Sequence, residues 1–276
     1  MLLVRTTFLL FTTHLRRIFT TRRALVCIVL ALLPALVAFL IAHFSRRIDE
    51  TEIVVHIGGI MLLQIVVPLL ALIAGSAVVA EEVEDRTITY LFSRPIPRAS
   101  LLFGRWLATF VFLAAVLALA TWLFLHAAST SHAVRSLSFR SLGLRGLGEE
   151  QPVPQLAAGF GWTLYQAVLL GATVYSALFA VAGIVFKSPI LVGLGYTFAV
   201  EGFLANLPGG NQALTIQFYL RSWMLERGGA AWKVEGVELD HPDKAATVLT
   251  TLACVLAVTL AFGAWRIVRR EFVLTS

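Results

Sequence analysis

Six runs of mostly apolar residues divide the chain, and each is about as long as a membrane-spanning helix. A helix that crosses a bilayer needs roughly 20 predominantly apolar residues. The runs have approximate ends and cover Ala24–Phe44, Gly58–Ala80, Ala99–Ala127, Gly159–Phe186, Pro189–Leu207 and Ala245–Val268. The pattern predicts an all-α membrane protein with six transmembrane helices, forming a single domain over residues 1–276.

Residues 1–23 precede the first run and have an amphipathic pattern. Apolar residues recur every three or four positions and therefore share one helical face. That face holds Val4, Phe8, Phe11, Leu15 and Ile18, and the opposite face holds Arg5, Thr12, Arg16 and Arg23. We expect an interfacial helix with its arginines toward anionic headgroups. The alternative is a cleaved signal peptide, but the apolar run after Arg23 is too long for one and no clear cleavage site follows it.

The basic residues predict which side of the membrane each end occupies. An even number of spans puts both ends on one side, and cytoplasmic segments are enriched in lysine and arginine. Arginines cluster before the first run and around the end of the sixth, as Arg16, Arg17, Arg22, Arg23, Arg266, Arg269 and Arg270. Both termini are therefore predicted to be cytoplasmic. Two outer segments follow from this topology: a polar one at Ser129–Pro154, and Pro208–Lys244, whose helical periodicity predicts a short amphipathic helix along the outer leaflet.

Composition agrees with the membrane assignment. The chain is 58% hydrophobic and only 14% charged, with a mean hydropathy of +0.84, which is too apolar for a soluble domain of this length. The net charge of +6 does not indicate nucleic-acid binding, because the arginines sit at the ends of apolar runs. Cys27 and Cys254 lie inside such runs, where apolar packing is the simpler interpretation.

The densest charge cluster lies between the second and third runs. Four acids, Glu81, Glu82, Glu84 and Asp85, follow directly on the second run and should extend its helix into the cytoplasm. Thr87–Phe92 could form a short helix parallel to the membrane. Pro95 and Pro97 lack N–H donors and would end that helix. From the residues alone, an ordinary charged loop is an equally good interpretation.

The order of residues in this segment resembles the first cytoplasmic loop of ABC-2 permeases. The sequence Thr-x-x-Tyr-Leu-Phe-Ser-Arg-Pro-Ile-Pro-Arg from Thr87 to Arg98, then Leu101-Leu102-Phe103-Gly104-Arg105, is similar to a family pattern of roughly E-x-E-x-G-T-x-x-Y-L-L-S-x-P-x-x-R. Arg86 stands where the family usually has glycine, which would ease the turn. The amphipathic start is similar to the family's elbow helix. Among subfamilies, the chain looks closest to the NosY-like small permeases.

The resemblance implies a function. The chain would be the permease subunit of an ATP-driven exporter in a bacterial or archaeal plasma membrane, bound to a dimeric cytoplasmic ABC ATPase and to a second permease copy or paralogue. ATP and Mg²⁺ would be bound by the ATPase, and this chain would bind no cofactor and no metal and catalyse no reaction. The implied ATPase-coupling interface comprises Glu81, Glu82, Glu84, Asp85, Thr87, Tyr90, Leu91, Phe92, Ser93, Arg94 and Arg98.

The sequence lacks the motifs of a nucleotide site or a hydrolase. It contains no GxxxxGK[ST], no HExxH and no GxSxG. Five of the six histidines fall at or beyond the predicted outer face, and their spacing fits no known metal-ligand set. ATP chemistry would therefore have to enter from another chain.

Glu201 is the one acid within the fifth run. Counting about 1.5 Å per residue from Pro189 places it toward the outer face. An ionisable group there is a candidate for a translocation path, because exposure to lipid is costly. The alternative is that the span breaks near Gly202 and leaves Glu201 in water. Small residues at Ala172, Ser176 and Ala180 in the fourth run permit close helix packing, against this chain or a second copy.

Three other functions are alternatives to the exporter. A secondary transporter would normally show more spans, repeats and paired intramembrane charges. A membrane-embedded enzyme would need catalytic groups at one depth. A non-transporting scaffold driven by an ABC ATPase is the alternative that the sequence excludes least.

Overall fold

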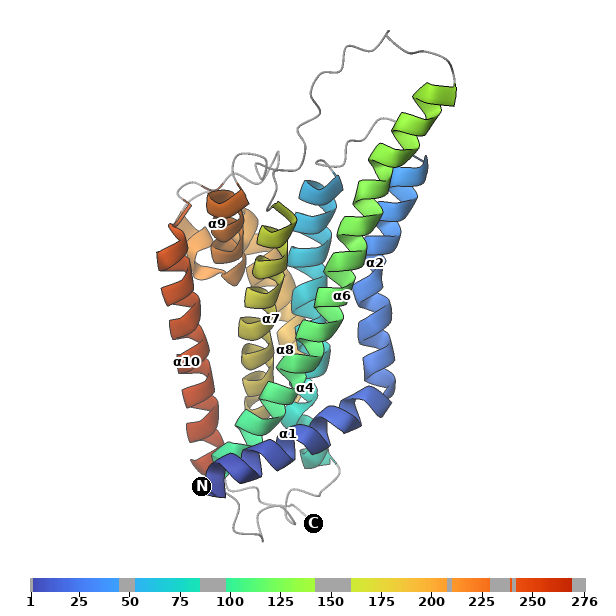
Figure 1. The fold of residues 1–276 in the computed structure, drawn as a ribbon. Helices are drawn as coiled ribbons and strands as arrows, with labels where there is room; N and C mark the ends of the chain where they lie inside the picture. Colours follow the sequence, from blue (N-terminus) through green and yellow to red (C-terminus); the bar gives the residue numbers. More distant parts are fainter. Residues whose placement is uncertain are drawn as a thin grey trace.

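The described part of the chain, residues 2–44, 53–84, 98–141, 160–207, 210–228, 239 and 242–269 of a computed structural model, is helical and contains no strand. Figure 1 shows the helices as one elongated bundle. Their order is α1 (Leu2–Thr20), α2 (Arg22–Phe44), η1 (Val54–Val66), α4 (Val67–Glu84), α6 (Arg98–Ser141), α7 (Phe160–Val185), α8 (Pro189–Gly195), η2 (Tyr196–Phe203), η3 (Leu204–Asn206), η4 (Gly210–Leu214), α9 (Ile216–Gly228) and α10 (Ala245–Arg269).

Six helical segments are long and apolar enough to cross a membrane, as predicted. They are Arg22–Phe44, Val54–Val78, Ser100–Thr130, Phe160–Val185, Pro189–Asn206 and Ala245–Arg269. The second joins the π-helix η1 to α4, and the fifth joins α8 to the π-helix η2 and the 3₁₀ turn η3. In a bilayer every backbone polar group must find a partner within the protein, and long helices meet that demand.

The third span continues further than its apolar run. We expected a polar outer segment from Ser129, but α6 remains helical to Ser141. The residues beyond the apolar run are largely compatible with a helix, so a change in polarity did not mark the helix end. Hydropathy locates the part of a helix suited to lipid and does not locate its terminus.

Helix α1 lies at one end of the bundle and runs across the spans (Figure 1). It packs mainly on α6, and the contact is close at Gly104, where a Cβ would come within 2.8 Å of the Thr7 carbonyl oxygen. This crossing decides which face of α1 is covered: His14 is 8% exposed, whereas Phe8, assigned to the apolar face, is 64% exposed. The predicted helix is confirmed, and its place at a membrane interface stays a prediction.

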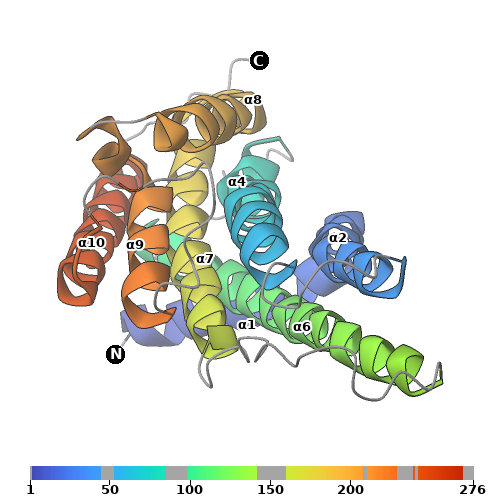
Figure 2. The same cartoon turned by 90° about the horizontal axis from the view of Figure 1, so that it is seen from above.

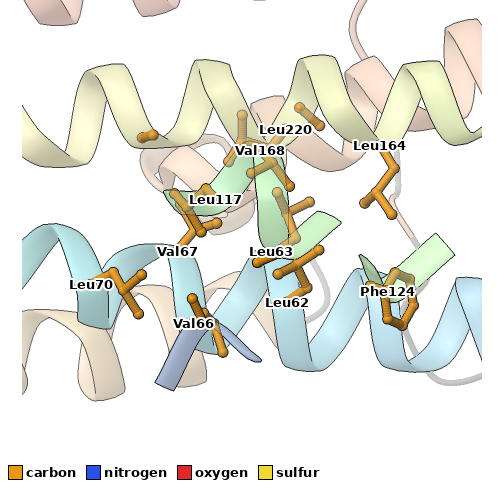
Figure 3. Close-up of a cluster of buried hydrophobic side chains, with 14 of the residues drawn as sticks. Leu62, Leu63, Val66, Val67, Leu70, Leu117, Phe124, Leu164, Val168 and Leu220 are labelled. Atoms are coloured by element: carbon orange, nitrogen blue, oxygen red, sulfur yellow. The ribbon is translucent and has the colours of Figure 1, made fainter. Parts of the chain in front are cut away.

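Helices α4 and α7 form the centre of the bundle, with α2 and α6 on one side and α9 and α10 on another (Figure 2). Leucines and valines from several helices meet there (Figure 3). The residues labelled in that view are Leu62, Leu63, Val66, Val67, Leu70, Leu117, Phe124, Leu164, Val168 and Leu220. All of them are buried and belong to one hydrophobic cluster.

Close packing of α4 on α7 depends on small residues from both helices. A Cβ on Gly75 would lie 3.1 Å from the Ser176 carbonyl oxygen, and one on Gly183 would lie 2.7 Å from the Ser76 carbonyl oxygen. Ala172, Ser176 and Ala180 are fully buried. The small-residue series of the fourth run therefore packs inside this chain, with Ser176 and Ala180 against α4.

Helix α9 occupies the end of the bundle opposite α1 (Figure 1). The predicted helix is confirmed, and its place along the outer leaflet stays a prediction. Helix α9 packs on α7 and α10, and its residues Ile216, Gln217, Phe218, Leu220, Ser222, Trp223 and Met224 are buried. Periodicity identifies the face to be covered, and here the protein's own helices cover it.

Candidate functional site

The predicted coupling segment connects α4 to α6 in the sequence, and the end of α4 and the start of α6 lie at the α1 end of the bundle (Figure 1). Helix α4 runs through Glu81, Glu82 and Glu84, which confirms that the acids extend the second helix, and α6 begins at Arg98. The rest of the segment, Asp85 to Pro97, lies outside the described residues. That stretch includes Asp85, Arg86, Thr87, Tyr90, Leu91, Phe92, Ser93 and Arg94.

The two helices that flank this segment are joined by Arg105. Its side chain is 8% exposed, and its Nη1 donates a hydrogen bond of 3.0 Å to the Val78 carbonyl oxygen of α4. A hydrogen bond from a charged donor is stronger than one between neutral groups. A displacement of the segment between α4 and α6 would therefore act on both helices together.

Trp106 extends this connection to the fourth span. Its Nε1 donates a hydrogen bond of 3.1 Å to the Ser176 hydroxyl oxygen of α7. The Ser176 hydroxyl in turn donates to the Thr173 carbonyl oxygen at 3.0 Å. Arg105 and Trp106 are adjacent in α6, so the start of α6 is tied to α4 on one side and to α7 on the other.

His14 of α1 packs beside the same region of α6. Its Nε2 lies 3.5 Å from the Thr109 hydroxyl oxygen. Burial lowers the pKa of His14 from 6.5 to about 4, and the positive charges of Arg105 and Arg17 add to the effect. The imidazole is therefore neutral near pH 7. Sequence reasoning missed His14, although it lies on the same helical face as Leu10 and Ile18, both packed against the core.

Glu201 is the central residue of a second polar cluster, at the α9 end. It lies on η2 and is 0% exposed. Its Oε1 accepts hydrogen bonds from the Tyr196 hydroxyl at 2.6 Å and from the Ile216 amide at 3.1 Å. Its Oε2 accepts one from the Gln217 amide at 3.0 Å.

The position of the two amide donors explains how an acid is accommodated in this buried place. Ile216 and Gln217 are the first two residues of α9, and amides at the start of a helix have no partner within that helix. The aligned peptide dipoles also give a helix start a partial positive charge, which favours a carboxylate. Glu201 thus anchors α9 to the fifth span. In this arrangement it is not left in water, and whether it lines a translocation path stays a prediction.

Two further side chains of α9 connect it to the second span. Gln217 Nε2 donates to the Leu63 carbonyl oxygen at 3.0 Å, and Arg221 Nη2 donates to Gln64 Oε1 at 2.7 Å. Arg221 Nη1 also donates to the Ala205 carbonyl oxygen at 3.3 Å and to Asn206 Oδ1 at 3.1 Å. Burial lowers the pKa of Arg221 below its ordinary value.

Sequence reasoning did not identify these partners. Gln64 was the available signal, because a polar amide inside an apolar run needs a hydrogen-bonding partner within the protein. Its partner Arg221 is far away in the chain, so the pairing could not be predicted. Both π-helices contribute to the cluster: η1 through Leu63 and Gln64, and η2 through Tyr196 and Glu201.

The described residues contain no group of three or more His, Cys, Asp or Glu side chains placed to hold a metal ion. The chemistry they offer is hydrogen bonding between helices at the two ends of the bundle, by Arg105 at one end and by Glu201 and Arg221 at the other. This arrangement can transmit or resist movement between spans.

The chain was compared with models of protein families. A family model described as "ABC-2 family transporter protein" matches residues 8–200, which include most of α1, the first four spans and most of the fifth. The matched region encloses the whole segment between α4 and α6 and almost reaches Glu201. A search of curated proteins finds no match.

Proposed function

Because the chain belongs to the ABC-2 family of transporter proteins, and is therefore the membrane permease of an ABC transporter, we propose that it is the permease subunit of an exporter. ATP would be hydrolysed by a separate cytoplasmic ABC ATPase dimer, with Mg²⁺ bound there. Two permease copies, or this chain and a paralogue, would complete the complex. The observation on which the proposal rests is the family match over residues 8–200, more than half of the chain.

The contacts at the α1 end support a route for coupling. We propose that the ATPase binds the residues from Glu81 to Arg98, with Tyr90, Leu91 and Phe92 as the apolar anchor. ATP-driven closure of the ATPase dimer would then displace the segment between α4 and α6. Since Arg105 ties α6 to α4 and Trp106 ties α6 to α7, three spans would respond together.

The coupling proposal is tested by placing charge in the proposed anchor. Tyr90→Asp with Leu91→Asp should abolish co-purification of the ATPase and stimulation of its ATP hydrolysis by the permease. Leu214→Asp is a suitable control, because Leu214 is 74% exposed at the opposite end of the bundle. An intact complex with normal stimulation in the Tyr90–Leu91 variant would contradict the coupling role.

The cluster at the α9 end suggests a second moving part. We propose that Glu201 reaches the translocation path only when α9 moves away from η2, because both carboxylate oxygens are occupied while α9 is in place. Cysteine labelling can test this in a chain whose Cys27 and Cys254 are replaced by alanine. Ile216→Cys keeps Glu201 and the amide that donates to it, and the side chain at this position is 6% exposed. The cysteine should react with a water-soluble thiol reagent during ATP turnover and resist it at rest.

A control variant makes this result specific. Ala120→Cys lies in the third span, is 1% exposed, and should resist the reagent in both states. Equal labelling of Ile216→Cys with and without ATP would contradict the moving-part proposal. Glu201→Gln with full transport activity would argue against a role for its charge in the path.

A further inference from the structure

A pocket opens at the junction of α1 and α2. The chain bends at Thr21 between these helices, and Figure 1 shows α1 and α2 meeting at an angle. It lies between α1, α2, α4 and α6, and its empty volume is about 370 Å³, including the part open to its surroundings. The lining residues are His14, Arg17, Ile18, Thr21, Arg23, Ala24, Cys27, Ala74, Ala77 and Phe112. None of these residues is acidic.

Two arginines from different helices give the pocket its charge. Arg17 comes from the last turn of α1 and Arg23 from the first turn of α2, and both side chains are exposed. Each also makes interactions within the protein, and a guanidinium group has five N–H donors, so one contact does not exhaust it. Paired guanidinium groups are well suited to bind the oxygens of a phosphate.

Two other groups make the pocket favourable for an anion. Helix α2 begins at Arg22, beside the pocket, and the start of a long helix has a partial positive charge. His14 supplies a neutral imidazole near pH 7, because burial lowers its pKa to about 4. A neutral imidazole can donate or accept a hydrogen bond without adding charge to the buried end of the pocket.

The remaining lining is apolar and small. Ala24, Cys27, Ala74 and Ala77 leave room beside Phe112, and exposed apolar side chains continue from the pocket along α2, beginning with Leu25 at 66% exposed. A basic mouth next to an apolar surface of a spanning helix matches a molecule with a charged head and a hydrocarbon tail. Basic pockets between spanning helices commonly bind acidic lipid headgroups.

We propose that this pocket binds the phosphate of an acidic phospholipid, with Arg17 and Arg23 at the phosphate and the lipid chain along α2. The lipid would bridge α1 to α2 and would sit beside the α4–α6 connection at Arg105. It is a specific site, distinct from the general attraction between the arginines of residues 1–23 and a charged membrane surface.

The test compares two charge-matched double variants of the full-length chain, delipidated in detergent and titrated with phosphatidylglycerol. Bound lipid is counted by native mass spectrometry. Arg17→Gln with Arg23→Gln should weaken binding roughly thirtyfold, from the loss of two basic contacts. Arg16→Gln with Arg22→Gln removes the same charge from exposed positions outside the pocket and should change the affinity less than about threefold.

A third variant tests the pocket without changing charge. Ala77→Leu fills part of the apolar lining and should weaken phosphatidylglycerol binding at least about fivefold, with both arginines intact. This variant keeps the test valid if the arginine variant does not fold, as judged by circular dichroism and gel filtration. Unchanged binding in Ala77→Leu would overturn the proposal.

The remaining arms separate the sources of phosphate. Phosphatidylcholine should bind at least about tenfold more weakly than phosphatidylglycerol, and inorganic phosphate should not displace the lipid. Displacement by inorganic phosphate at millimolar concentration would make the pocket a site for free phosphate and overturn the lipid assignment. Equal losses in the two arginine pairs would also overturn it, because they would show attraction to the surface alone.

Discussion

At the α1 end of the bundle a buried cation holds neighbouring spans together, whereas at the α9 end a buried carboxylate does so. Arg105 donates to Val78, a carbonyl inside α4 that the helix's own backbone can also use. Glu201 accepts from Ile216 and Gln217, whose amides stand at the start of α9 and have no partner within that helix. The α9 end therefore depends more strongly on its charged residue.

This difference suits different tasks. The hydrogen bond from Arg105 to Val78 can break and form again in another position at low cost, because the Val78 carbonyl keeps a partner within α4. A segment that moves between α4 and α6 would require such a bond. A connection that satisfies helix-start amides resists separation, so α9 should leave η2 only when energy is supplied. Four measurements test this difference between the two ends of the bundle.

The largest expected effect is at Glu201. Glu201→Ala leaves the Tyr196 hydroxyl and two buried amides without an acceptor, and it should lower the free energy of unfolding by about 3–5 kcal/mol. Denaturant unfolding in detergent micelles measures the change. Glu226→Ala, an exposed glutamate on the same helix α9, should change it by less than about 0.5 kcal/mol. Similar values for the two variants would remove the anchoring role of Glu201.

The second effect concerns His14 and pH. Because its pKa is about 4 in the folded chain and 6.5 when exposed, the unfolded chain binds more protons between these values. The contribution of His14 to the free energy of unfolding is therefore fully present above about pH 6.5. It is lost as the pH falls toward 4, and the loss is up to about 3 kcal/mol. His14→Gln should show a smaller loss over this range than the wild type. His126→Gln, at an exposed position, should retain the wild-type dependence.

The third effect tests the crossing of α1 over α6. Gly104→Ala would press a Cβ against the Thr7 carbonyl oxygen, a backbone atom, and should cost about 1–3 kcal/mol of stability. Gly195→Ala is the matched control, since a Cβ there meets nothing within 4 Å, and it should be neutral or slightly stabilising. Thermal unfolding of both variants in detergent is sufficient. Equal melting temperatures for Gly104→Ala and Gly195→Ala would mean that α1 does not pack closely on α6.

The smallest effect is at Trp106. Trp106→Phe removes the hydrogen bond to Ser176 and should lower stability by about 1 kcal/mol while the transporter still assembles. If the link transmits movement from α6 to α7, substrate-stimulated ATP hydrolysis should fall more than binding of the ATPase. Trp122→Phe, 58% exposed on the same helix, should leave both unchanged.

The sequence predicted the six spans within a few residues, apart from the extension of α6 to Ser141. It also predicted that the acids after the second run continue its helix, which α4 confirms through Glu84. It singled out Glu201 as an unusual acid. It could not predict that this acid accepts hydrogen bonds from the first amides of α9. Helix α9 begins 15 residues later, in an outer segment that periodicity alone placed along the outer leaflet.

The spans are determined by the sequence itself, because an apolar run in lipid must satisfy its backbone hydrogen bonds within one helix and can be recognised locally. The π-helical form of η1 and η2 was not predicted. The contacts that each side chain makes with other helices are decided by the tertiary structure. The burial of His14, the contact of Ser176 with α4, and the pairing of Arg221 with Gln64 all depend on how helices rotate and cross. Those angles follow from side chains packing over the whole bundle, so no single stretch of the chain specifies them.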